Sequence, residues 1–153
     1  MHGLNIVLVE PEIPQNTGSV GRLCVATNST LHLVEPLGFK ITESAVKRAG
    51  LDYWEHLKLV THTNVESFLD SIPKNAPRFF LSKKAGKTIY DCEFLPGSYL
   101  IFGKETAGLP DWVLNQNAVN GFRIPMYDAR VRSLNLATSV GICTYEAIRQ
   151  IGP

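Results

Sequence analysis

Cysteine is scarce in this chain, and long apolar runs are missing. The three cysteines, Cys24, Cys92 and Cys143, are far apart and form no Cys-x-x-Cys pair. An odd, scattered set argues against a disulfide framework and against a zinc site, and it is typical of a reducing compartment. The longest apolar runs, such as residues 6–9, are far too short to span a bilayer. The first residues lack the basic region and apolar stretch of a signal peptide, so we expect a cytoplasmic protein without a membrane segment.

Three common motifs of nucleotide-binding and hydrolytic enzymes are also missing. The chain has no Gly-x-Gly-x-x-Gly after its first apolar run, no Gly-x-x-x-x-Gly-Lys-Ser/Thr and no Gly-x-Ser-x-Gly. These absences argue against a Rossmann-type dinucleotide enzyme, a P-loop enzyme and an α/β-hydrolase. The four histidines do not sit at metal-ligand spacing, so we expect no metal site and a structural role for each. They are His2, His32, His56 and His62.

A large excess of charge of one sign is absent too. The formal net charge of the 153 residues is +1, so a polyanionic partner would have to be held by a local basic patch. With 44% hydrophobic and 19% charged residues, the composition is that of an ordinary globular protein. The length predicts a single domain over residues 1–153, with a core that needs neither disulfides nor metals.

Short apolar runs alternate with segments of helical periodicity. Strands are predicted at 4–9, 31–34, 57–60, 78–81, 99–102 and 122–124. One helix is predicted to begin with Asn16 or Thr17 as its N-cap and to end at Asn28. Further helices are predicted at 44–49, 65–72 and 111–115, and Ser133 is the predicted N-cap of a last helix. The expected core face of that helix is Ala137, Val140, Gly141, Thr144, Ile148 and Ile151. Apolar strands alternating with helices predict an α/β fold with a parallel sheet covered on both faces.

Three polar segments follow predicted strands or lie close to them. The first is Asn16-Thr17-Gly18 with Arg22 after it, the second is Phe-Gly-Lys-Glu-Thr-Ala-Gly-Leu-Pro at 102–110, and the third runs from 124 to 136. Each taken alone could be an ordinary connecting turn. Ligands of open α/β sheets bind beyond the carboxyl ends of strands, and Gly103 would let the backbone approach a flat ring closely. Together the segments indicate a ligand site whose loop amides and carbonyls read an adenine edge.

At these segments the sequence resembles the SPOUT superfamily of RNA methyltransferases. Within it, the chain is most similar to the minimal tRNA methyltransferases that modify the ribose of the wobble nucleotide, cytidine or uridine. The resemblance covers nearly the whole chain, including residues 5–8, 10–14, 16–18, 22–24, 35–36, 38–39 and 48–53. The most specific signal is the ordered set of Asn16 to Arg22, Phe-Gly-x-Glu-x-x-Gly-Leu-Pro, and Ser-x-Asn-Leu at 133–136.

The resemblance implies several properties that the pattern of residues alone does not give. It implies a parallel sheet whose C-terminal part is tied in a deep trefoil knot, a homodimer whose active site draws on both chains, and S-adenosylmethionine bound in the knot. The cofactor residues it implies are Leu81, Gly103, Ile124, Met126, Ser133 and Leu134. This sequence departs from the family pattern at Lys104, where proline is usual, at Ala107, where a basic residue is common, and at 127–131, which is one residue longer. These departures bear on RNA choice and loop geometry.

Methyl transfer to a ribose hydroxyl needs an in-line arrangement of oxygen, methyl and sulfur, and removal of the hydroxyl proton. The family assigns proton removal or substrate orientation to the arginine of the first motif, here Arg22. Because arginine stays protonated in proteins, we favour a clamp on phosphate or hydroxyl and keep the base as the second role. Glu105 is expected either to orient Arg22 or a substrate hydroxyl, or to cap the turn that follows it. Asn16 and Asn135 are expected to fix a ribose, with helix starts as the alternative.

RNA is the expected partner, held by a basic patch whose phosphate contacts give affinity and not sequence choice. The candidates are Lys47, Arg48, Lys83, Lys84, Lys87, Arg130 and Arg132, and Tyr145 is expected to reach the target base, the other subunit or the core. A single-stranded anticodon loop is a target that such a surface can read. Two alternatives stay open: a 2′-O-methyltransferase of ribosomal RNA or another tRNA position, and a cofactor-binding RNA chaperone without catalysis.

Overall fold

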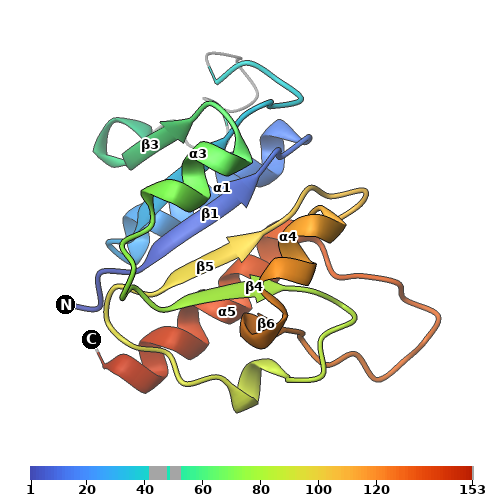
Figure 1. Cartoon of the computed structure of the whole chain (residues 1–153). Helices are drawn as coiled ribbons and strands as arrows, with labels where there is room; N and C mark the ends of the chain where they lie inside the picture. The colour runs from blue at the N-terminus through green and yellow to red at the C-terminus, as the bar shows by residue number, and fades with distance from the viewer. Residues whose placement is uncertain (42–47, 49–52, 153) are drawn as a thin grey trace.

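The computed structural model describes residues 1–41, 48 and 53–152. In this part of the chain, six parallel strands form one sheet in the order β3-β2-β1-β5-β4-β6 (Figure 1). The strands are β1 (Asn5–Val9), β2 (Thr30–Val34), β3 (Lys58–His62), β4 (Arg78–Leu81), β5 (Tyr99–Phe102) and β6 (Gly121–Phe122). The predicted α/β fold with a parallel sheet is therefore confirmed, and β4 and β5 have the predicted bounds.

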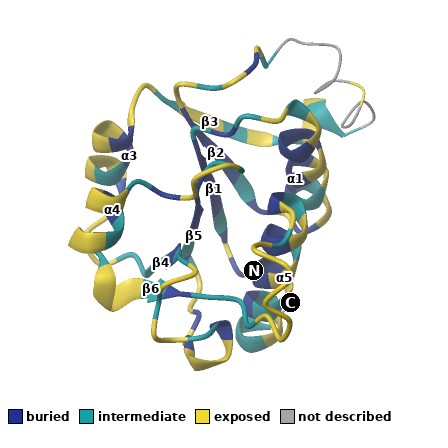
Figure 2. Ribbon diagram, turned by 90° about the vertical axis from the view of Figure 1, so that its right-hand side faces the viewer, coloured by how far each residue is buried: buried dark blue, intermediate teal, exposed yellow. Residues whose placement is uncertain are grey.

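Helices cover both faces of the sheet, as Figure 2 shows edge on. The helices α1 (Pro14–Ala26) and α5 (Leu136–Ile151) lie on one face, and α3 (Val65–Ser71) and α4 (Asp111–Gln116) lie on the other. Alternate residues of β1 serve the two layers: Ile6 and Leu8 belong to the core cluster under α1 and α5, and Val7 and Val9 to the cluster under α3 and α4. Because a strand buried on both faces needs apolar residues at every position, the central strands β1 and β5 are nearly continuous apolar runs, whereas β3 at the edge is largely exposed.

Short 3-10 turns complete the fold, at η1 (Trp54–His56), η2 (Ile89–Asp91) and η3 (Ala118–Asn120). No helix among the described residues is long and apolar enough to cross a membrane. The helix predicted at 44–49 lies outside the described residues, apart from Arg48. In the predicted core face of α5, Val140 and Thr144 are buried, and Ala137, Ile148 and Ile151 are half-buried and pack against the same core. The prediction omits the buried Ser139, Cys143 and Ala147.

The predicted N-caps of both long helices are wrong. Helix α1 begins at Pro14, with Ile13 as N-cap, so Asn16 and Thr17 lie inside its first turn. Proline suits this first position because its fixed φ is helical and its missing N–H would have no partner there. Helix α5 has Asn135 as its N-cap and not Ser133, because the Asn135 side chain accepts from the Thr138 amide.

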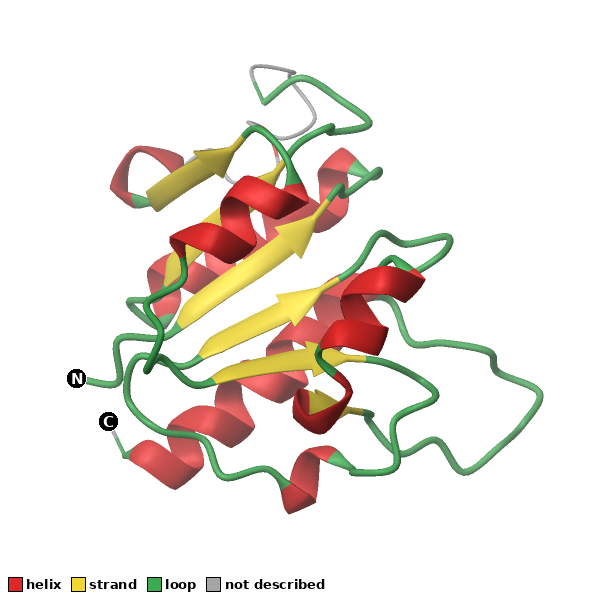
Figure 3. Ribbon diagram, in the orientation of Figure 1, coloured by secondary structure: helices red, strands yellow, loops and turns green. Residues whose placement is uncertain are grey.

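The strand order decides which loops can form a common site. The carboxyl ends of β1, β5, β4 and β6 are neighbours, in that order. The loops that leave them are drawn in green in Figure 3, and the long loop between β6 and α5 extends beyond the arrowheads. The three segments singled out in the sequence all belong to this edge of the sheet.

Candidate active site

The carboxylate of Glu105, in the loop after β5, binds the start of α1. It accepts hydrogen bonds from the backbone amides of Glu12 (2.7 Å) and Ile13 (3.1 Å) and from Nδ2 of Asn16 (3.4 Å). The amides at the start of a helix lack partners within the helix and carry partial positive charge, which favours a carboxylate there. Glu105 therefore binds the N-cap residue Ile13 and Glu12 before it, and so supports the start of α1 from a distant loop and not the turn that follows Glu105.

A second glutamate makes the reciprocal contact. The carboxylate of Glu12 accepts from the Thr106 amide (3.1 Å) and from its hydroxyl (2.7 Å). These bonds, led by the one from the Thr106 side chain, lower the pKa of Glu12 because they favour the charged form. Two carboxylates thus join the loops after β1 and β5, an arrangement that we call the glutamate clasp (Glu12, Glu105 and their partners). Glu12 lies in the segment 10–14 that resembles the SPOUT family, and its residue type and position in the sequence do not predict this role.

Two asparagines connect the clasp to the third segment. Nδ2 of Asn135 donates to Oδ1 of Asn16 (3.0 Å), and Oδ1 of Asn135 accepts from the Thr138 amide (3.1 Å). Because a carboxylate only accepts, the Asn16 group that faces Glu105 must be its NH2, which fixes both amide orientations. Each side-chain carbonyl is engaged, and each NH2 keeps one N–H to spare. The asparagine pair therefore presents N–H donors. These suit an acceptor oxygen, such as that of a phosphate, better than they suit a hydroxyl that donates.

Arg22 lies apart from this group. It is exposed on α1, and its guanidinium carbon is 4.9 Å from the centre of the Tyr53 ring, a cation–π distance. Among the described residues, no hydrogen bond or ion pair joins it to Glu105, Asn16 or Asn135. Within one chain the structure brings together Asn16, Glu105 and Asn135 and leaves Arg22 outside.

The candidate cofactor residues follow three adjacent strands. Leu81 ends β4 and pairs with Phe122 of β6, so Leu81 and Ile124 lie close to the same sheet edge. Both are half-buried and pack against the core under α1 and α5. Gly103 directly follows β5 and is buried, Leu134 is half-buried, and Met126 and Ser133 are exposed.

Gly103 is needed for a reason different from the one expected. A Cβ at this position would lie 2.0 Å from the carbonyl carbon of Gly108 and 2.1 Å from the nitrogen of Leu109. The loop is closed by the hydrogen bond from the Gly108 amide to the Lys104 carbonyl (2.9 Å). The space that a side chain would take is thus filled by the loop's own backbone, and not reserved for a flat ring.

The candidate RNA residues are exposed, and four of them lie in loops at the same sheet edge. Lys83 and Lys84 lie in the loop after β4, and Arg130 and Arg132 lie in the loop before α5. Nε of Arg130 donates to Oδ1 of Asp128 (3.0 Å), a contact that lowers the pKa of the Asp128 carboxyl. The remaining candidates sit elsewhere: Arg48 and Lys87 are exposed, Tyr145 is exposed on α5, and Lys47 lies outside the described residues.

The structure has two surface hollows outside the candidate cofactor residues. One, of about 260 Å³, is lined by residues at the start of β4 and β6 and by the η2 segment, among them Phe79, Asp91 and Gly121. The other, of about 480 Å³, is lined by residues 35–41 beyond β2. The linings of these two hollows contain none of the candidate cofactor residues.

Comparison with known proteins gives a consistent picture. The family model described as the SpoU rRNA Methylase family matches residues 3–145. The tRNA (cytidine(34)-2′-O)-methyltransferase of Polaromonas sp. (strain JS666 / ATCC BAA-500) is 47% identical over 150 residues, which cover 97% of this chain and 91% of that protein. A solved structure concerned with the 2-OH methylation of C/U34 on tRNA is 46% identical, has a TM-score of 0.93, and covers 97% of this chain and 96% of its own. The AdoMet-bound rRNA methyltransferase from Sinorhizobium meliloti shares the fold at 23% identity, with a TM-score of 0.88 over 99% of this chain and 57% of that one.

Proposed function

The chain belongs to the SpoU rRNA methylase family, and we propose that it methylates the ribose 2′-OH of the wobble nucleotide, cytidine or uridine, in the tRNA anticodon loop. The observation that carries the proposal is the meeting of Asn16, Glu105 and Asn135 at one sheet edge. These are the polar residues of the three matched segments, and they lie in a chain that aligns almost end to end with a tRNA nucleotide-34 methyltransferase.

S-adenosylmethionine is the proposed methyl donor, and it would supply an electrophilic methyl group to the ribose oxygen. The residues present fit such a molecule. Leu81, Ile124 and Leu134 offer half-buried apolar surface for a flat ring, and Ser133 offers an exposed hydroxyl beside them. We assign Met126 and the backbone next to Gly103 to the same site, which follows the carboxyl ends of β4, β5 and β6.

The polar residues divide into holding and positioning roles. The spare N–H groups of Asn16 and Asn135 bind an acceptor oxygen of the RNA, and the glutamate clasp keeps them in place. Arg22 holds a phosphate or the ribose oxygen and lowers the cost of forming the alkoxide. Proton removal by Arg22 is the second assignment. The phosphate contacts come from Arg48, Lys83, Lys84, Arg130 and Arg132, with Tyr145 at the target base or the other subunit.

A homodimer is the proposed assembly, and the position of Arg22 supports it. It is separated from the asparagine pair of its own chain, while Ile142 and Tyr145 expose apolar surface on the neighbouring helix α5. We propose that α1 and α5 pack against a second copy, so that Arg22 of one chain serves the site of the other.

Mixed dimers test this shared site. A dimer of one Arg22→Ala chain and one Asn135→Ala chain has one intact site if the two residues come from different chains, and none if they come from the same chain. With random mixing, about one quarter of wild-type turnover is expected from two inactive parents. No recovered turnover in a verified mixed dimer would contradict the shared site.

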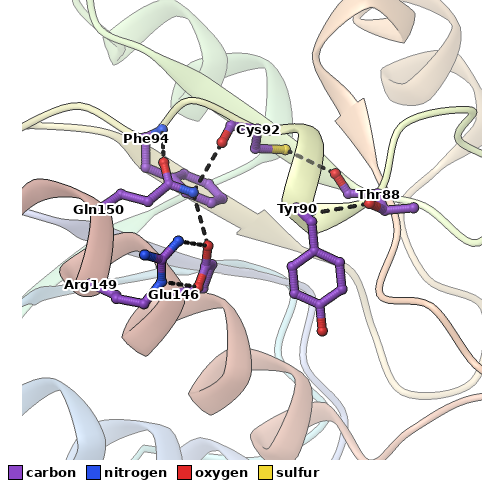
Figure 4. A network of polar contacts seen from close by, with 7 residues as sticks. All are labelled: Thr88, Tyr90, Cys92, Phe94, Glu146, Arg149 and Gln150. Carbon is purple, nitrogen blue, oxygen red and sulfur yellow. Dashed lines mark hydrogen bonds and ion pairs between the residues drawn. The ribbon is translucent and has the colours of Figure 1, made fainter.

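The C-terminal knot is a further part of the proposal. After β6 the chain returns across the sheet as α5, which packs on α1, while the segment 88–94 lies against the last turn of α5. There Gln150 accepts from the Phe94 amide (2.9 Å) and donates to the Cys92 carbonyl (3.1 Å) (Figure 4). These contacts hold the chain end against the loop through which a trefoil knot would need it to pass, and an experimental structure traced through 82–152 would check the knot.

The activity itself is tested with tRNA from a strain that lacks the gene. The purified protein should transfer label from S-adenosylmethionine to this tRNA, and mapping should place the methyl group at nucleotide 34. Methylation of ribosomal RNA or another tRNA position would favour a related 2′-O-methyltransferase. Full RNA binding without turnover would favour a chaperone. A cytoplasmic location agrees with a tRNA substrate and with three cysteines that are free and buried.

A further inference from the structure

The two loops that flank the proposed cofactor site are paired beyond the ends of their strands. The Ser82 amide donates to the Phe122 carbonyl (2.8 Å), which continues the parallel contact between β4 and β6. Further on, the Arg123 amide donates to the Lys87 carbonyl (2.9 Å), and the Arg123 carbonyl accepts from the Ile89 amide (2.8 Å). Residues 82–89 therefore form a loop whose two ends pair with residues 122 and 123.

The Arg123 side chain adds a bond that closes this pairing. It is half-buried, and its Nε donates to the Ala85 carbonyl at 3.1 Å. Ala85 lies in a turn closed by the bond from its amide to the Ser82 carbonyl (3.2 Å). One side chain from the β6 loop thus holds the middle of the β4 loop, at a point that the backbone ladder does not reach.

The two held loops carry residues assigned to the cofactor. Leu81 directly precedes the held turn, and Ile124 directly follows Arg123. Movement of the turn around Ala85 would change the distance between these two apolar side chains. We propose that Arg123 is a positioning residue that fixes the two sides of the S-adenosylmethionine site relative to each other through its Nε–H. This inference rests on the proposed function.

Two substitutions separate the hydrogen bond from the charge. In Arg123→Gln, the side-chain NH2 is attached to the same carbon position as Nε of arginine, so the bond to Ala85 can be kept while the charge is removed. Arg123→Met has similar length and no donor. If loss of the bond lowers the population of the binding-competent loop arrangement to about one tenth, the apparent Kd rises about tenfold, or about 1.4 kcal/mol.

The measurement is calorimetric binding of S-adenosylmethionine to the full-length protein. We expect Arg123→Met to raise the Kd about tenfold, and Arg123→Gln to stay within about twofold of the wild type. A substitution that only destabilises the fold lowers the fraction of protein that can bind, which is measured as a lower binding stoichiometry. It leaves the Kd of the folded fraction unchanged. In steady-state kinetics the KM for S-adenosylmethionine should rise while kcat at saturation stays near that of the wild type.

Arg78→Met is the matched control. Arg78 also bonds loop carbonyls, with Nη2 2.8 Å from the Pro73 oxygen, but at the opposite end of β4. The Kd of Arg78→Met for S-adenosylmethionine should equal that of the wild type. Equal weakening of S-adenosylmethionine binding by Arg123→Gln and Arg123→Met would overturn the proposal in favour of a charge effect. If Arg123→Met does not fold, the Kd of Arg123→Gln decides alone. Failure of the wild type to bind S-adenosylmethionine would overturn the proposed function and this inference with it, whereas normal binding by Arg123→Met would overturn the inference alone.

Discussion

Replacement of Glu105 by glutamine tests whether the glutamate clasp serves turnover as well as stability. Three N–H donors converge on its carboxylate, from Glu12, Ile13 and Asn16. In Glu105→Gln one carboxylate oxygen becomes an NH2, so at least one of these donors faces another donor. An unsatisfied buried donor costs about 1–3 kcal/mol. Because the site is partly exposed, we expect about 1–2 kcal/mol and a Tm lower by about 2–8 °C.

The effect on turnover should exceed what stability explains. Asn16 is held by Glu105 and in turn holds Asn135, so the spare N–H groups of both shift when the clasp loosens. A misplacement of about 1 Å near the reacting atoms can cost about 100-fold in rate, and we expect kcat to fall by about 10- to 100-fold. The assay is label transfer from saturating S-adenosylmethionine to undermethylated tRNA, with thermal unfolding measured on the same samples.

Glu146→Gln supplies the matched control for this experiment. Glu146 also accepts three side-chain bonds, two from Arg149 and one from Gln150, near the end of α5 (Figure 4). These bonds lower the pKa of Glu146 to about 2. The control should lose stability and keep its kcat. Equal kcat values for the two variants, at equal loss of Tm, would refute a positioning role for the clasp and leave Glu105 as a helix cap alone.

Three further outcomes are expected. Gly103→Ala should lower the free energy of unfolding by more than about 3 kcal/mol, because the new Cβ would overlap the backbone of residues 108 and 109. The control Gly86→Ala should be near neutral, because nothing lies within 4 Å of its new Cβ. Similar urea midpoints for the two variants would contradict the steric argument. Burial, with His62 as a second cause, lowers the pKa of His32 to about 4, whereas its pKa in the unfolded state is about 6.5. Between these two pKa values the unfolded state therefore binds more protons than the folded state. The free energy of unfolding should fall by about 2 kcal/mol as pH drops through this range. Urea midpoints at about pH 7.5 and about pH 5 measure this; His32→Gln should flatten the dependence and the exposed His56→Gln should not. Lys83→Gln and Lys84→Gln should each lower the salt slope of tRNA binding by about 1, whereas Lys58→Gln, at the amino end of β3, should leave it unchanged.

Strands could be predicted from the sequence wherever both faces of the sheet are buried. Residues 79–81 and 99–102 are apolar or aromatic, and Arg78 stands only at the start of the first run, so the structure gives the predicted bounds. Strand β6 is shorter than predicted, because it sits at the edge and pairs only at Gly121 and Phe122. Arg123 continues the run in sequence, but its backbone bonds go to residues 87 and 89 of a loop.

The start of α1 could not be predicted from local pattern. The amides of Glu12 and Ile13, which lead into the helix, are bound by Glu105, 93 residues away from Glu12, so the contact that fixes this start lies outside the segment. Asn16 has the residue type of an N-cap, and it instead bonds Asn135 and Glu105. The meeting of the three polar segments was predictable, because parallel strands place their following loops at one edge. The distance of Arg22 from that meeting point was not.

The bonds that shape the site join loops that local sequence cannot hold. The clasp links the loops after β1 and β5, the asparagine pair links α1 to α5, and Arg123 links the loops after β4 and β6. Each of these contacts exists only when neighbouring strands are already in register. Order at the site therefore depends on all of these loops together, so that substitutions within this set should couple at the site, unlike those at well-separated positions. A double substitution of Glu105 and Asn135 that lowers kcat no further than the worse single change would show that the loops act as one unit.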